Sequence, residues 1–132
     1  MIKSAEEFYR LRTSEDPEEY NRATNEEAPI EIWFDILKKF PDLKTWVIHN
    51  KTVPEEILRL LSADLEPSVR WAVANKRKCP ADILVILAKD SDDSVRLRVA
   101  HNPKVTREIL ETLTSDSWDK IVKVSKDKLD KM

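Results

Sequence analysis

The chain has 132 residues, a formal net charge of −2 and no glycine, although average usage predicts roughly nine. Without glycine the chain cannot carry a GxGxxG dinucleotide fingerprint, a Walker-type phosphate loop, a GxSxG nucleophile elbow or an EF-hand turn. With 41% hydrophobic and 36% charged residues and no run of about 18 apolar residues, the composition predicts one soluble helical domain rather than a disordered chain or a membrane helix.

The cysteine content and the first residues predict the cytoplasm as the compartment of this chain. Cys79 is the one cysteine, so an internal disulfide and a cysteine-based metal site are both excluded, and nothing requires an oxidising environment. Residues 1–12 carry several charged side chains and lack the apolar stretch of a signal peptide. We therefore expect a cytoplasmic protein without a membrane partner.

Residues 1–27 are predicted to form short helices that cap one end of a repeat array. Ser4 with Glu7, and Asp16 with Glu19, have the spacing of a capping box, which marks the start of a helix. Arrays of stacked repeats need such a cap, because a terminal repeat otherwise exposes the apolar side that packs against a neighbour.

A repeat with a period of 26 residues follows and holds without a gap from Leu43 to about Ile121. Several series of residues recur at this offset: Leu58, Leu84 and Leu110; Ile57, Ile83 and Ile109; Asp64, Asp90 and Asp116; Val47, Val73 and Val99; and Asn50 and Asn102, with Lys76 between them. So many coincidences at one spacing predict a repeat architecture.

Each 26-residue unit is predicted to be a pair of helices, of which the first carries an apolar stripe. These first helices start near Pro54, Pro80 and Thr106, because proline suits the first helical position and threonine caps it. The apolar residues of the stripe fall at i, i+1 and i+4, as at Ile57, Leu58 and Leu61.

The second helix of each unit is shorter and begins after a break such as the one at Pro67. It is predicted to bury one apolar face, made in one unit by Val69, Ala72 and Val73. It ends near Asn75 or Asn102, where we expect asparagine to adopt the left-handed conformation that glycine usually supplies at a helix end.

These elements predict a single domain over residues 1–132. Its parts are an N-terminal helical cap at 1–27, a degenerate repeat at 28–53 that starts a helix at Pro29, repeats at 54–79 and 80–105, and a last repeat with the C-terminal cap at 106–132.

The stretches V-R-W-A-V-A-N at 69–75 and V-R-L-R-V-A-H-N-P at 95–103 resemble the V-R-x-A-V-A-x-N-P-x-T-P signature of leucine-rich repeat variant proteins. This family belongs to the HEAT-like helical solenoids, and the resemblance covers roughly residues 29 to 125. It implies an all-α fold, a right-handed α-solenoid of about four 26-residue, two-helix HEAT-like repeats with N- and C-terminal helical caps. One founding member of the variant class carries an iron–sulfur cluster on an N-terminal cysteine group, a property that Cys79 alone does not transfer.

The two histidines are the obvious candidates for metal binding or catalysis, but they occupy the same repeat position two periods apart. At about 8–10 Å per layer of helices, this spacing puts His49 and His101 roughly 20 Å apart. A shared zinc needs both within about 2.1 Å. We therefore expect no metal site, no cofactor and no catalytic residue, and a helix-end or partner-contact role for the histidines.

An aspartate and an arginine recur six residues apart, at Asp64 and Arg70 and again at Asp90 and Arg96. In HEAT-like repeats a similar pair forms a ladder of hydrogen bonds along the stack. An arginine can bind turn carbonyls and a carboxylate together, because its guanidinium group presents five donors. We expect these residues to be structural.

Charge alternates with the two helices of each unit. The second helices and the loops after them, at residues 43–54, 67–81 and 94–106, hold nine basic residues and no acidic one, whereas the first helices and their turns are acidic. Helix dipoles account for part of this pattern, because acids favour helix starts and bases favour helix ends. The alternative is a basic face that also presents Trp71 and Leu97, whereas Trp33, Trp46 and Trp118 are predicted to pack in the core or caps.

The sequence therefore predicts a monomeric, non-enzymatic protein-binding module, and its small size also fits an inhibitor or immunity-type protein whose acidic cap binds the target. The alternative is nucleic-acid binding through the basic second-helix layer, although a net charge of −2 argues against it. The residues predicted to bind the partner are Lys44, Arg70, Trp71, Lys76, Arg77, Lys78, Arg96, Leu97 and Arg98.

Overall fold

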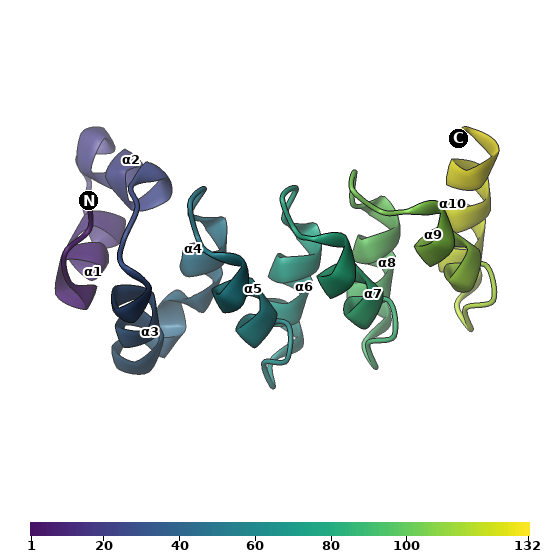
Figure 1. Cartoon of the computed structure of the whole chain (residues 1–132), viewed down its shortest axis with the longest axis horizontal. Coiled ribbons are helices and arrows are strands. Elements are labelled where there is room, and N and C mark those ends of the chain that lie inside the picture. The colour runs from purple at the N-terminus through teal and green to yellow at the C-terminus, as the bar shows by residue number, and fades with distance from the viewer. The chain divides into compact units, whose positions relative to one another are not determined.

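A computed structural model describes all 132 residues and shows an all-α protein (Figure 1). It contains ten α-helices, one short 3-10 helix and no strand. In chain order these are α1 (Ala5–Thr13), α2 (Pro17–Asn25), α3 (Ile30–Lys39), η1 (Pro41–Leu43), α4 (Lys44–His49), α5 (Glu55–Leu61), α6 (Pro67–Asn75), α7 (Ala81–Leu87), α8 (Asp93–His101), α9 (Arg107–Leu113) and α10 (Asp119–Asp130).

The chain divides into two compact units, unit 1 at Met1–Leu61 and unit 2 at Ser62–Met132. Unit 1 contains 9 lysines and arginines against 13 aspartates and glutamates, so its formal charge is −4. Unit 2 contains 14 basic and 12 acidic residues, so its formal charge is +2. The two units therefore differ in the sign of their charge.

In unit 1, α1 packs against both α2 and α3, and α3 packs against α4. The side chains of Phe8 and Trp33 are fully buried and meet edge to face, with ring centroids 5.7 Å apart. Ile36 and Val47 complete this core from α3 and α4. The prediction that Trp33 packs inside is confirmed.

The two predicted helix starts in unit 1 are capped as the sequence indicates, but not by reciprocal boxes. The Ser4 hydroxyl accepts a hydrogen bond of 3.0 Å from the backbone N–H of Glu7, and the Asp16 carboxylate accepts one of 3.0 Å from that of Glu18. The Glu7 carboxylate accepts from the backbone N–H of Lys3 instead of that of Ser4.

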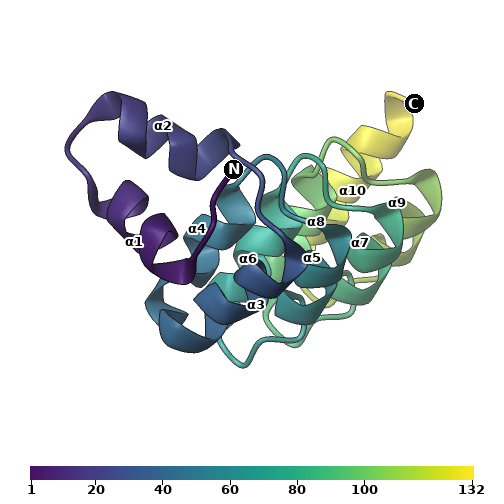
Figure 2. The same ribbon diagram turned by 60° about the vertical axis from the view of Figure 1, so that its left-hand side comes forward.

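In unit 2 the helix bounds repeat at an offset of 26 residues. This offset relates α6 to α8 and α7 to α9, and α10 starts 26 residues after α8. The helices α6, α8 and α10 form one layer, because α8 packs against both of the others, and α7 and α9 lie on one side of this layer (Figures 1 and 2). The predicted starts near Pro80 and Thr106 are confirmed, and the Thr106 hydroxyl caps α9.

The predicted apolar stripes are buried between the two layers of unit 2. The first helices bury Ile83, Leu84, Leu87, Ile109, Leu110 and Leu113, and the second helices bury Val69, Val73, Val95, Val99 and Ile121. The prediction that Ala72 is buried is wrong. Ala72 is only half-buried, and Ala74 is the alanine of α6 that is fully buried. Both Ala74 and Ala100 lie one position after the core valine, and both are fully buried.

The expectation of left-handed asparagine caps is wrong, because no residue of the chain has a positive φ. Asn102 follows α8 with φ −67° and ψ 132°, and it is almost completely buried. Its side-chain amide donates hydrogen bonds to the carbonyls of Ala74, at 2.7 Å, and Lys76, at 2.9 Å, while its carboxamide oxygen accepts from Lys104 N–H at 2.8 Å. Asparagine thus follows the helix without a left-handed backbone, and its side chain donates to carbonyls at the C-terminal end of α6, of which the Lys76 carbonyl also accepts from Cys79 N–H.

Asn50 makes the same connection in unit 1. Its side-chain amide donates to the carbonyls of Ala23, at 2.8 Å, and Glu26, at 3.0 Å, and its carboxamide oxygen accepts from Thr52 N–H at 2.8 Å. Asparagine therefore recurs at this position because its side-chain amide bonds to backbone carbonyls near the end of an earlier helix.

Candidate functional site

The nine residues predicted to bind a partner lie on three helices and one loop in the structure. Lys44 lies on α4 in unit 1, whereas the other eight lie in unit 2. Arg70 and Trp71 are on α6, and Arg96, Leu97 and Arg98 are on α8. The remaining three, Lys76, Arg77 and Lys78, form the loop that follows α6.

Arg70 and Arg96 are held in nearly identical ion pairs. The Arg70 guanidinium donates to the Asp90 carboxylate at 2.7 and 3.1 Å and to the Asp64 carbonyl at 2.7 Å. One period later, Arg96 donates to the Asp116 carboxylate at 2.8 and 3.3 Å and to the Asp90 carbonyl at 2.7 Å. The expected ladder is present, and each arginine reaches the carboxylate of the following turn rather than that of its own turn.

These ion pairs are largely shielded from solvent. The Arg70 and Arg96 side chains are 13% and 14% exposed. Hydrogen bonds to Asp90 and Asp116 raise the pKa of both guanidinium groups. Burial alone would raise the pKa of the Asp116 carboxyl group. Its hydrogen bonds from Arg96 and from Trp118 N–H lower the pKa by more, so the net shift is downward. The charge of both arginines is balanced inside unit 2, so neither offers an unpaired charge to a partner.

Trp71 and Arg98 meet across the neighbouring helices α6 and α8. The Arg98 guanidinium carbon lies 5.1 Å from the centre of the Trp71 ring, and its Nη1 donates to the Asn75 side-chain oxygen at 3.3 Å. Trp71 is 37% exposed and Leu97 is half-buried. We call Trp71, Asn75, Leu97 and Arg98 the α6–α8 face, which combines an aromatic ring, an aliphatic side chain and a cation that has no carboxylate partner.

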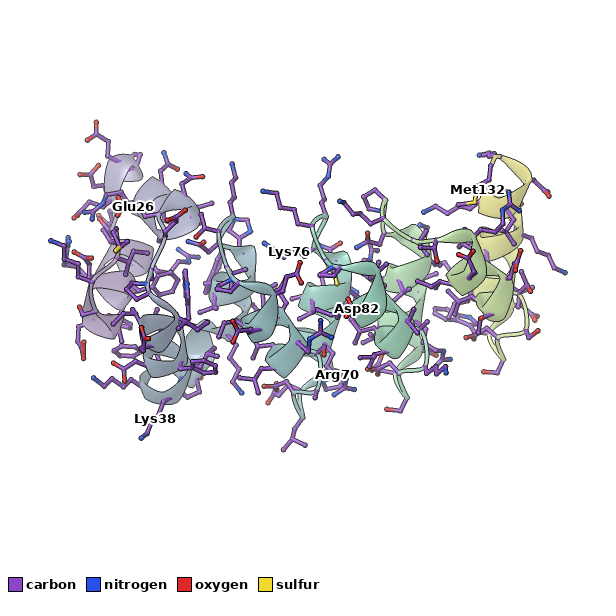
Figure 3. All side chains as sticks on the ribbon, in the orientation of Figure 1. Glu26, Lys38, Arg70, Lys76, Asp82 and Met132 are labelled. Atoms are coloured by element: carbon purple, nitrogen blue, oxygen red, sulfur yellow. The ribbon has the colours of Figure 1, made fainter.

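The loop after α6 extends this face with positive charge. Arg77 and Lys78 are exposed, whereas Lys76 is half-buried, and burial followed by the charge of Lys78 lowers the pKa of Lys76. Arg70 and Lys76 lie toward opposite ends of α6 (Figure 3). The basic loop is therefore separate from the ion-pair ladder.

Cys79, at the end of this loop, is fully buried and is not part of a disulfide, and its thiol lies 3.7 Å from the Pro80 carbonyl oxygen. It occupies the repeat position of Val105, which is also buried. Its thiol thus packs as a small apolar group in the core of unit 2.

A second group of aromatic and basic residues lies in unit 1. The Arg12 guanidinium is stacked between Trp46, 3.3 Å from the ring centre, and Tyr20, 4.6 Å from the ring centre. Trp46 also meets His49 edge to face at 5.8 Å. These contacts join α1, α2 and α4, so Trp46 packs within the cap as predicted.

Two further surface features of unit 2 were missed in the sequence. His101 on α8 is surrounded by positive charge, that of Arg98 on its own helix and those of Lys128 and Lys120 on α10, and only the packing of α8 against α10 reveals this. On the other layer, Val85 and Ile86 of α7 are 46% and 53% exposed. A shallow groove of about 170 Å³ lies beside them, lined by Val85, Ala88, Lys89, Glu108, Ile109 and Thr112. Val85 and Ile86 occupy the repeat positions at which α9 has Glu111 and Thr112. This difference in the sequence already indicates an apolar surface on α7.

No group of three or more histidine, cysteine, aspartate or glutamate side chains is arranged to hold a metal ion. None of the helices combines the length and the apolar character that a membrane crossing requires. The fold and surface define an all-α protein with an aromatic and basic face on neighbouring helices. Comparison of the chain with protein-family models, curated proteins and solved structures found no match.

Proposed function

We propose that this protein is a non-enzymatic protein-binding module that recognises its partner through the α6–α8 face. The contact between Trp71 and Arg98 carries the proposal, because tryptophan and arginine are the residue types that dominate protein-interface hot spots. The hydrogen bond to Asn75 and the stacking on Trp71 hold the Arg98 side chain in place, so less conformational entropy is lost when a partner binds.

We further propose the architecture that the 26-residue period implies. In this proposal residues 1–132 form one cytoplasmic, monomeric domain, a right-handed solenoid of about four HEAT-like repeats related to the leucine-rich repeat variant proteins. The equal offsets of the unit 2 helices, the two arginine ion pairs and the two asparagine connections support it. An inhibitor or immunity-type role is one form that such a module takes.

Nucleic-acid binding is the second candidate, favoured by the exposed basic residues Arg77, Lys78 and Lys104. It is weakened by the ladder, since two of the nine basic residues that the sequence offers, Arg70 and Arg96, are already paired with aspartates. Phosphate binding needs several free cations along a track, and its affinity falls steeply with salt.

Affinity capture from lysate, with and without nuclease, tests the proposal. We expect the wild-type chain to retain a specific protein after nuclease treatment, and Trp71→Gln to lose it. Val85→Gln is the matched control, because it also replaces an exposed apolar residue on a helix of unit 2 but on the other layer. Loss of all captured material with nuclease supports nucleic-acid binding instead. Equal retention by Trp71→Gln and the wild type rejects the α6–α8 face as the binding surface.

A further inference from the structure

The last turn of α8 lies in a strongly positive environment. Burial lowers the pKa of His101, and the charges of Arg98, Lys128 and Lys120 lower it further. Arg98 is on α8 with the histidine, and the two lysines come from α10, which packs against α8. From α6 the neutral side chain of Asn75 accepts a hydrogen bond from Arg98. We call Arg98, His101, Lys120 and Lys128 the α8–α10 basic cluster.

None of these four side chains forms an ion pair within the chain. Arg98 donates its side-chain hydrogen bond to the neutral oxygen of Asn75, and its Nε atom is buried without a hydrogen-bond partner. Lys120 lies 5.7 Å from the centre of the Trp118 ring, and burial lowers the pKa of Lys128. The cluster differs in this respect from Arg70 and Arg96, whose charges are paired with aspartates.

Like charges that are held together without a counterion repel one another, and an anion that binds among them removes this cost. We propose that the α8–α10 basic cluster binds a carboxylate-rich segment of the partner protein. This inference rests on the proposed function, because Arg98 belongs both to the cluster and to the α6–α8 face. A partner that covers Trp71 would thereby bring its acidic segment over α10.

The surroundings of the cluster favour carboxylates over a nucleic-acid backbone. Asp119, Asp127 and Asp130 are interspersed with the four lysines of α10, so this helix is not a continuous track of positive charge. A nucleic acid would place further phosphates near these aspartates, whereas a peptide with a few glutamates can match the cluster alone.

Binding of carboxylates is expected to depend on pH through His101. A bound anion favours the imidazolium form, so the complex takes up a proton that the free protein binds weakly. Affinity should therefore increase as the pH falls from 7.5 to 5.5, a range in which glutamate side chains remain ionised.

The test uses a fluorescein-labelled decapeptide with five glutamates, and fluorescence anisotropy at low salt with the full chain. Lys120→Gln/Lys128→Gln should weaken binding about fivefold or more, since each exposed charge pair contributes modestly. Lys89→Gln/Arg107→Gln removes two exposed charges elsewhere in unit 2 and should change affinity less than about twofold. His101→Gln should abolish most of the gain in affinity at pH 5.5, and this variant keeps the test decisive if the double variant fails to fold.

Equal losses in the two double variants would overturn the inference, because binding would then reflect bulk charge. Tighter, cluster-dependent binding of a single-stranded oligonucleotide of equal charge would also overturn it, in favour of nucleic acid. Absence of peptide binding would overturn the inference but not the proposed function, provided that Trp71→Gln still loses the captured protein.

Discussion

Arg70 and Asp90, which are 20 residues apart in the chain, form a two-point ion pair with donor–acceptor distances of 2.7 and 3.1 Å. The same guanidinium also binds the Asp64 carbonyl at 2.7 Å, so one side chain ties the turn before α6 to the turn before α8. Arg96 and Asp116 repeat the arrangement one period on. This pairing decides which arginines hold the fold together and which are free to bind.

Arg96→Ala should destabilise the protein by about 2–4 kcal/mol, because it leaves the shielded Asp116 carboxylate without its partner. Arg98→Ala removes an arginine from the same helix that has no carboxylate partner, and we expect a loss of at most about 1 kcal/mol. Urea unfolding of both variants checks this difference. Equal losses would show that the ladder contributes no more to stability than an arginine without a carboxylate partner.

Asn102→Ala should cost about 1–3 kcal/mol, since the carbonyls of Ala74 and Lys76 lose their shared donor. Asn102→Asp should cost more, because it places a carboxylate against two carbonyl oxygens in a buried site. The order can be measured by thermal unfolding at pH 7. An aspartate variant as stable as the wild type would contradict the donor role of the side-chain amide.

Ser125→Ala should stabilise the protein by about 1 kcal/mol. Ser125 lies one period after Val99, is fully buried on α10, and its hydroxyl has no hydrogen-bond partner. Removal of an unpaired buried hydroxyl is favourable, and alanine also has the higher helix propensity. A decrease in the urea midpoint of this variant would mean that the hydroxyl is satisfied when the protein is in solution.

The stability of the protein should fall between pH 7.5 and 5.5 in part because of His101. Its folded-state pKa lies below the ordinary value of 6.5, so the unfolded chain binds the proton more readily. The stabilising contribution of the neutral imidazole is therefore fully present above the unfolded pKa and is lost as the pH falls from there through the lower folded-state pKa. Chemical unfolding at the two pH values should show a smaller decrease in the free energy of unfolding for His101→Gln than for the wild type. Equal decreases would show that His101 does not contribute to the pH dependence.

The helices were predictable from the sequence because their signals are local and repeated. Pro80 and Thr106 mark the starts of α7 and α9, and the buried stripe through Leu84 and Leu110 follows from periodicity. The asparagine caps were predicted wrongly, since a side chain that bonds to the preceding loop replaces the left-handed backbone expected at Asn102.

The candidate site was less predictable, because it depends on which helices become neighbours. Sequence spacing linked Arg70 to Asp64, whereas the structure pairs its guanidinium with the carboxylate of Asp90. The exposure of Trp71 was anticipated from its place opposite the core valines, and it is 37% exposed. The positive surroundings of His101 could not be seen, since Lys120 and Lys128 approach it from another helix.

Hydroxyl-radical footprinting of the protein alone and with its captured partner tests the central proposal most directly. Trp71 is readily oxidised where it is exposed, so the account predicts a severalfold slower oxidation of its side chain in the complex, with the rate at Val85 unchanged. An unchanged rate at Trp71, together with protection of Val85 and Ile86 on α7, would contradict the α6–α8 face and place recognition on the other layer of unit 2.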